Sequence, residues 1–124
     1  MKKLLIADDD PGIRRLVRMT LESDNYEILE ASDGEETLRL AREHKPVLLL
    51  LDVMMPRVDG FDICRELKSD PATSSTTIVI LSARTQESDL NEGRAAGADD
   101  YFMKPFSPVA LMRKVDEVLA LAGP

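Results

Sequence analysis

Leu48-Leu49-Leu50-Leu51 is an uninterrupted apolar run that ends directly on Asp52. A strand with one buried face alternates apolar and polar residues, whereas a central strand of a parallel sheet is covered on both faces and reads as continuous apolar sequence. The run Ile78-Val79-Ile80-Leu81 has the same character and ends on Ser82. Two such runs predict the centre of a parallel sheet with helices packed against both of its faces.

Strand-like and helix-like segments alternate on either side of these runs, which is typical of βαβ units. The stretch Glu27-Ile28-Leu29-Glu30 alternates partly, which indicates an edge strand. Strands are predicted at residues 3–7, 27–31, 47–51, 77–81 and 100–103. The first helix is predicted to begin at Pro11 with Asp10 as N-cap, and the second to run from a Ser32/Glu35 capping box to about residue 44. Three further helices are predicted at residues 60–69, at about 86–96 before Gly97, and at 108 to about 122. The predicted fold is an α/β doubly wound, five-stranded parallel sheet flanked by five helices.

Length and composition limit the classes of protein to which the chain can belong. The chain has 124 residues, which suits one domain, and a net charge of −7 from 16 Lys and Arg against 23 Asp and Glu. This acidity argues against direct nucleic-acid binding and fits a divalent cation or a basic partner better. The single cysteine, Cys64, cannot form an internal disulfide and is predicted to be a small buried apolar residue in a reducing compartment. No apolar run is long enough to span a membrane, so a soluble cytoplasmic protein is expected.

Polar residues that could carry chemistry follow four of the five predicted strands, whereas Ser32 and Asp33 after the second indicate only a helix cap. The former are Asp8, Asp9 and Asp10 after the first strand, Asp52 after the third, Ser82 after the fourth, and Lys104, which precedes Pro105, after the fifth. Each has an ordinary explanation by itself, as a helix cap, a solvated turn or a surface lysine. Ligands of open parallel sheets, however, bind outside the carboxyl ends of the strands. All these side chains are expected at that one edge, where a shared site explains them better.

The negative charges of three converging carboxylates must be compensated. Two of them about 4 Å apart repel each other by about 4 kcal/mol at an effective dielectric constant near 20, so the group must raise a pKa or gather cations. A few oxygen ligands with room for water suit Mg²⁺. A carboxylate beside Mg²⁺ and a lysine can act as a nucleophile on phosphorus and form an aspartyl phosphate.

The site motifs resemble those of the receiver domain of bacterial two-component response regulators. The resemblance covers the whole chain and rests on Leu4-Leu5-Ile6-Ala7-Asp8-Asp9-Asp10-Pro11, Leu51-Asp52-Val53-Met54-Met55-Pro56-Arg57-Val58-Asp59-Gly60, Ile80-Leu81-Ser82-Ala83 and Gly97-Ala98-Asp99-Asp100-Tyr101-Phe102-Met103-Lys104-Pro105-Phe106. It implies a flavodoxin-like sheet of strand order 2-1-3-4-5. It also implies a receiver domain over residues 1–122, with 123–124 as the C-terminal end or the start of a linker.

The resemblance implies a role for each site residue. Asp52 would be the phosphoacceptor, and the phosphoryl group would come from the phosphohistidine of a sensor histidine kinase or a histidine phosphotransfer protein. Mg²⁺, or Mn²⁺ in its place, would be bound by Asp8, Asp9, Asp52 and the backbone carbonyl of Met54, with Asp8 acting largely through water. Lys104 would pair with the phosphoryl oxygens and be joined to Pro105 by a cis peptide bond.

Further implied roles concern the switch and its output. Ser82 and Ala83 would bind the arriving phosphoryl group, Tyr101 would then move from an exposed to a buried rotamer, and Met54 and Arg84 would tune the lifetime of the phosphorylated state. The face formed by the fourth helix, fifth strand and fifth helix would control a downstream protein or an attached effector domain, without contacting nucleic acid or membrane. Asp100 and Lys114 keep one charged pair of the kind used for dimerisation there, whereas Leu90 and Ala110 replace charged partners. A monomer or a phosphorylation-dependent dimer is expected.

Two alternatives remain open. In a phosphatase similar to haloacid dehalogenases, Asp8 would be the nucleophile and Asp10 the acid. Ser82 and Lys104 would be phosphate ligands, and Asp99 with Asp100 a metal pair. That pair precedes Lys104 and opens a strand, which is the wrong order for that class. In the second alternative, the fold binds a partner without being phosphorylated. The intact set of site residues favours instead a phosphorylatable signalling domain that catalyses only its own phosphorylation and dephosphorylation. The lone histidine, His44, is expected to be structural.

Overall fold

The computed structural model describes residues 2–83 and 86–121. Its centre is one parallel sheet of strand order β2-β1-β3-β4-β5. The strands are β1 (Lys2–Ala7), β2 (Tyr26–Ala31), β3 (Leu48–Asp52), β4 (Thr77–Ser82) and β5 (Asp100–Met103). The order places β2 at an edge and β3 in the middle, as the alternating and continuous apolar patterns predicted, and it is the order of flavodoxin-like sheets.

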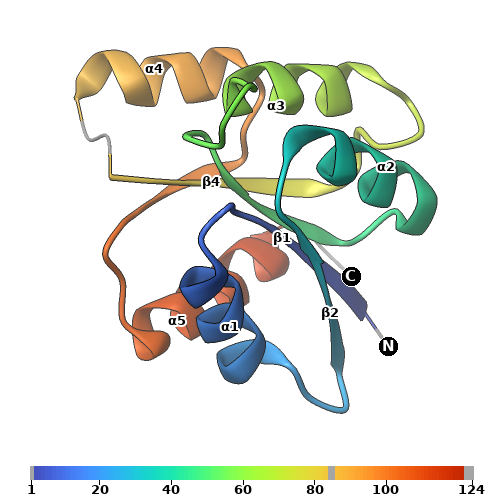
Figure 1. Cartoon of the computed structure of the whole chain (residues 1–124), viewed down its shortest axis with the longest axis vertical. Helices are drawn as coiled ribbons and strands as arrows, with labels where there is room; N and C mark the ends of the chain where they lie inside the picture. Colours follow the sequence, from blue (N-terminus) through green and yellow to red (C-terminus); the bar gives the residue numbers. More distant parts are fainter. Residues whose placement is uncertain (1, 84–85, 122–124) are drawn as a thin grey trace.

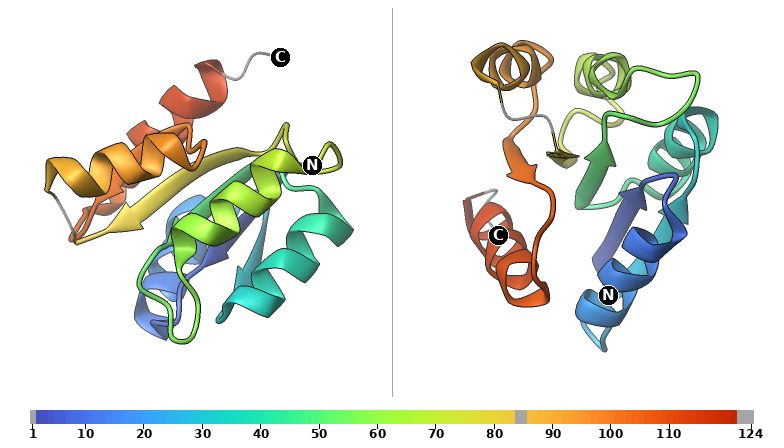
Figure 2. Two further views of the ribbon diagram at one scale, coloured as in Figure 1. Left: turned by 90° about the horizontal axis from the view of Figure 1, so that it is seen from above. Right: turned by 60° about the vertical axis from the view of Figure 1, so that its left-hand side comes forward.

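Helices cover both faces of the sheet. They are α1 (Pro11–Leu21), α2 (Gly34–His44), α3 (Gly60–Ser69), α4 (Glu87–Ala95) and α5 (Pro108–Leu121). Figure 1 shows α1 and α5 on one side of the sheet and α2, α3 and α4 on the other. In Figure 2, the left view looks down onto α3 and α4, with the sheet behind them. The fold is therefore the three-layered, doubly wound architecture predicted from the sequence.

The residues of β3 divide the apolar core between the two faces. Leu48 and Leu50 pack with Val17 of α1 and Leu111 of α5. Leu49 and Leu51 join a second cluster, whose helical members include Ala41, Phe61, Ile63, Cys64 and Leu67. All four leucines are buried, so the continuous apolar run does correspond to a strand covered on both faces.

The predicted ends of the elements need small corrections, and one predicted cap is wrong. The N-cap of α2 is Asp33, whose Oδ1 accepts a hydrogen bond from the Glu36 N–H at 2.8 Å, and not Ser32 paired with Glu35. Glu36 in turn accepts a hydrogen bond from the backbone N–H of Ser32 at 2.8 Å. The capping interaction thus exists one residue later than predicted, because the helix begins at Gly34.

Two further expectations concern Cys64 and the membrane. Burial raises the pKa of the Cys64 thiol to about 11, so this residue is protonated at neutral pH and packs as a small apolar group in α3, as predicted. Across residues 2–83 and 86–121, none of the helices combines the length and the apolar character needed to cross a bilayer.

Candidate functional site

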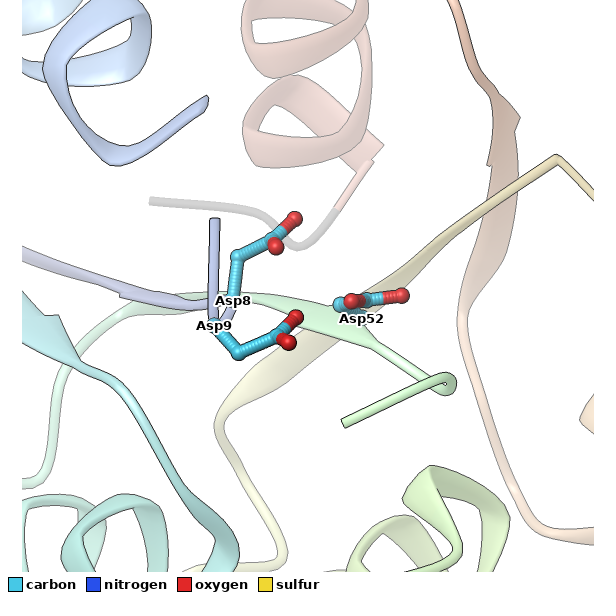
Figure 3. Close-up of side chains that lie close together, drawn as sticks. All are labelled: Asp8, Asp9 and Asp52. Atoms are coloured by element: carbon cyan, nitrogen blue, oxygen red, sulfur yellow. The ribbon is translucent and has the colours of Figure 1, made fainter. Parts of the chain in front are cut away.

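Three carboxylates meet at the carboxyl edge of the sheet. Asp8 and Asp9 follow β1, and Asp52 is the last residue of β3. One oxygen from each side chain lies within 4.8 Å of the others. Figure 3 shows the three carboxylate groups gathered in one region at the ends of their strands. Asp8 and Asp52 are buried whereas Asp9 is exposed, so the cluster opens to solvent on the side of Asp9.

Lys104 supplies the positive charge at this edge from the segment that follows β5. Its Nζ lies 2.7 Å from Oδ2 of Asp8 and 3.6 Å from Oδ2 of Asp52. Its backbone N–H donates to the carbonyl of Ser82 at 2.9 Å, which ties the segment to the end of β4. The peptide bond between Lys104 and Pro105 is cis. The lysine thus faces both buried carboxylates, although it lies far from them in sequence.

Backbone groups hold the other oxygen of each buried carboxylate. Oδ1 of Asp8 accepts the N–H of Asp10 at 3.0 Å, and Oδ1 of Asp52 accepts the N–H of Met54 at 3.0 Å. Both side chains are therefore oriented before any ligand arrives. Each turns its Oδ2 towards the ammonium group of Lys104, at 2.7 Å for Asp8 and 3.6 Å for Asp52.

The environment of Asp52 disfavours its charge. Burial raises the pKa of the Asp52 carboxyl above its ordinary value because desolvation penalises the ionised form, and the neighbouring Asp8 carboxylate raises it further. The hydrogen bond from Met54 and the charge of Lys104 both lower this pKa and offset part of the effect. One lysine beside three acids leaves negative charge uncompensated, so the cluster suits a cation with a preference for oxygen ligands.

The remaining predicted site residues differ in how far they are exposed to solvent. Ser82 is fully buried at the end of β4, and Ala83 is exposed directly after it. The side chain of Met54 is 60% exposed. Tyr101 is half-buried in β5 and lines a hollow against α4 together with Leu90 and Gly93. Arg84 lies outside the described residues.

The acidic residues that the phosphatase alternative requires are engaged elsewhere. Asp10 caps α1 by accepting the N–H of Gly12 at 2.8 Å. Asp99 accepts the N–H of Ile78 at 2.8 Å, near the amino end of β4, and Asp100 pairs with Lys114 at 2.8 Å. Asp99 and Asp100 thus lie at the amino edge of the sheet, opposite the carboxyl edge that holds Asp8, so a metal bound by them would not lie beside Asp8 as nucleophile.

Two contributors to the site were not anticipated from the sequence. Arg14 of α1 donates from Nη1 to the backbone carbonyl of Asp8 at 2.8 Å. Gly60, at the start of α3, lies so close to the β3 end that an added Cβ would be 2.4 Å from the Cα of Val53. The i, i+4 arrangement of Arg14 and Arg18 on α1 is a signal that could have indicated a shared acidic partner.

Comparisons with known proteins agree with this geometry. Residues 4–116 match the family model described as the response regulator receiver domain. The transcriptional regulatory protein ResD of Bacillus subtilis (strain 168) is 42% identical over 121 residues, which are 98% of this chain and 49% of ResD. The chain spans about half the length of the curated relatives it matches.

Two solved structures extend the comparison to the fold. The chemotaxis response regulator CheY4 of Vibrio cholerae has a TM-score of 0.89 at 33% identity, covering 95% of this chain and 98% of CheY4. The BeF3-activated DrrB receiver domain has a TM-score of 0.85 at 32% identity, covering 97% of this chain and 98% of that one.

Proposed function

This chain belongs to the family of response regulator receiver domains, and we propose that it accepts a phosphoryl group on Asp52 from a histidine kinase or a histidine phosphotransfer protein. The observation that carries the proposal is the position of Asp52. It is buried, it has one oxygen fixed by the backbone, and its other oxygen is 3.6 Å from Lys104 Nζ beside two further carboxylates. A lone structural aspartate needs neither the lysine nor the two further carboxylates, Asp8 and Asp9.

The transfer itself follows from this orientation. Oδ2 of Asp52 attacks the phosphorus of the phosphohistidine, the P–N bond breaks as the O–P bond forms, and the imidazole leaves and takes up a proton. The ammonium group of Lys104 lies where it stabilises the charge that develops on the phosphoryl oxygens. Its pairing with Asp8 holds the ammonium at that position before the donor arrives.

Mg²⁺ is the metal we propose for the acidic cluster, with Mn²⁺ able to replace it. The donors are all oxygen atoms, and the exposure of Asp9 leaves room for the waters that Mg²⁺ retains. Asp9, Asp52 and the Met54 carbonyl would hold it directly, and Asp8 largely through water. A divalent ion held by these residues would supply positive charge to neutralise the phosphoryl oxygens during transfer.

A switch follows from the charge of the product. A phosphoryl group adds roughly two negative charges and strong acceptor oxygens, so it favours the arrangement that brings Ser82 and Ala83 towards it. Tyr101, at the hollow between β5 and α4, would follow this movement. We propose that the face of α4, β5 and α5 transmits the change to a downstream protein or an attached effector domain, as a monomer or a phosphorylation-dependent dimer.

The proposal is tested by intact-mass measurement. Incubation with Mg²⁺ and phosphoramidate is expected to add about 80 Da in a stoichiometric burst, and EDTA is expected to prevent it. Absence of any adduct in the presence of Mg²⁺ would contradict phosphoacceptor function. Steady hydrolysis of phosphate esters without an adduct would instead support a phosphatase.

The metal assignment predicts that Mg²⁺ stabilises the fold. A ligand that binds only the native state stabilises it by about 2.7 kcal/mol at one hundred times its dissociation constant. The unfolding temperature of the wild type is therefore expected to rise with Mg²⁺ concentration, and Asp9→Asn is expected to remove most of the increase. Asp24→Asn is the matched control, because Asp24 is an exposed acid outside the cluster. An equal response of the two variants in thermal denaturation would contradict the assignment.

A further inference from the structure

Arg14 connects α1 to the acidic site through a main-chain atom. It lies in the first turns of α1, and its side chain is only 19% exposed. Its Nη1 donates to the carbonyl oxygen of Asp8 at 2.8 Å, and its Nε donates to Oε1 of Glu30 at 3.2 Å. The guanidinium group is therefore bound on two sides, by the loop after β1 and by the edge strand β2.

Glu30 is itself held in place. Its second oxygen, Oε2, accepts a hydrogen bond from Nε of Arg18 at 2.7 Å, one turn further along α1. Arg18 also donates to the backbone carbonyl of Ile28 in β2 at 3.1 Å. The carboxylate of Glu30 thus bridges two guanidinium groups on one face of α1, which prevents Arg14 from turning away from Asp8 without breaking other bonds.

The carbonyl that Arg14 binds belongs to the peptide bond between Asp8 and Asp9. The other polar atoms of Asp8 are already engaged: its N–H with Ala31 at 3.1 Å, Oδ1 with Asp10 and Oδ2 with Lys104. The plane of a peptide bond is rigid, so its carbonyl and the N–H of the next residue turn together. Holding the Asp8 carbonyl therefore sets the direction in which Asp9 leaves the buried strand end.

We infer that Arg14 is a positioning residue for the acidic site, acting through the Asp8–Asp9 peptide to align the carboxylates that bind the divalent cation. The inference rests on the proposed function. The direction in which Mg²⁺ affinity changes when Arg14 is removed distinguishes positioning from a simple charge effect. A nearby guanidinium charge opposes cation binding, so removing it should strengthen Mg²⁺ binding if charge alone mattered. Loss of positioning should instead weaken the binding.

The test is a titration of ¹⁵N-labelled protein with MgCl₂, without a phosphoryl donor, followed through the backbone amide shifts of Asp9 and Asp10. Arg14→Met is expected to weaken Mg²⁺ binding roughly tenfold, the usual effect of removing a group that orients metal ligands. Arg15→Met is the matched control, since it removes the same charge from an exposed position on the same helix. It is expected to leave the dissociation constant unchanged or slightly lower.

Unchanged or tighter binding by Arg14→Met would overturn the inference while leaving the proposed function intact. No response of the wild type to Mg²⁺ would overturn both. Arg14→Lys keeps the inference testable if Arg14→Met fails to fold, because it keeps the charge but loses the planar fork that binds Asp8 and Glu30 together, and it is expected to raise the dissociation constant by a smaller factor. Glu30→Gln removes an anion, which weakens cation binding by itself, so it is compared only in combination with Arg14→Met. The double variant should bind about as weakly as Arg14→Met alone. Fully additive effects would overturn the action of Glu30 through Arg14.

Discussion

Asp52→Asn is expected to abolish the 80 Da phosphoryl adduct and, at neutral pH, to make the fold more stable. The adduct is lost because an amide is a far weaker nucleophile than a carboxylate oxygen. The stability gain follows from the position of Asp52, which is 3% exposed and next to the carboxylate of Asp8. An uncharged side chain of the same shape removes both the desolvation penalty and the repulsion.

The pH dependence of this gain has a definite sign. The folded-state pKa of Asp52 lies above its ordinary value of 3.8, so the folded protein binds the proton more tightly than the unfolded chain. The contribution of Asp52 to stability is therefore present at pH values below 3.8 and is lost as the pH rises through the raised pKa. Above that pKa, the ionised carboxylate destabilises the fold.

Urea denaturation of the wild type and Asp52→Asn between pH 4 and 8 measures the effect. We expect a gain of roughly 1 kcal/mol at pH 7 without Mg²⁺, because relief of repulsion is partly offset by lost pairing with Lys104. This corresponds to an increase of about 3–5 °C in Tm. The difference should shrink towards low pH and on addition of Mg²⁺.

The exposed control Asp24→Asn should still form the adduct at the wild-type level. An adduct on Asp52→Asn would assign the phosphoacceptor role to another residue.

The position of the acidic cluster and Lys104 could be predicted from the sequence because the rule that locates them depends on topology. Asp8, Asp52 and Lys104 are far apart in the chain, yet each follows a strand, and parallel strands bring such positions to one edge. That placement predicts Lys104 at the same edge as both acids, and the structure adds the distances of 2.7 Å to Asp8 and 3.6 Å to Asp52. The need of the cluster for a cation followed from the residue types, because three carboxylates repel one another.

What could not be predicted depends on tertiary contacts. Both Ser32 and Asp33 are good N-caps with a glutamate three residues later, so local sequence cannot separate them. The structure starts the helix at Gly34, where an added Cβ would be 2.6 Å from Val58. The bond from Arg14 to Asp8 was equally hidden, because its acceptor is a backbone carbonyl that every residue possesses. Neither the choice between the two N-caps nor the bond from Arg14 to Asp8 can be predicted from a short stretch of sequence.

Gly60→Ala is expected to destabilise the protein by roughly 3 kcal/mol, at the upper end for overpacking. Gly60 is buried at the first position of α3, where an added Cβ would be 2.4 Å from the Cα of Val53 and 2.9 Å from the carbonyl oxygen of Asp52. Both are backbone atoms, so relief of the clash requires movement of the chain that leaves β3. The displaced peptide directly follows Asp52, the proposed phosphoacceptor. Weaker Mg²⁺ binding should therefore accompany the loss of stability in any folded fraction.

Gly12→Ala is the matched control, because Gly12 occupies the first turn of α1 and is exposed. There the nearest atom to an added Cβ is Oδ1 of Asp10 at 3.1 Å, a side-chain atom that can move. Alanine is favoured over glycine within helices by up to about 1 kcal/mol, so this variant should be near neutral in urea denaturation. Similar unfolding free energies for the two variants would contradict the steric argument. A large difference would show that the approach of α3 to the end of β3 admits only glycine, which makes the helix start part of the support for Asp52.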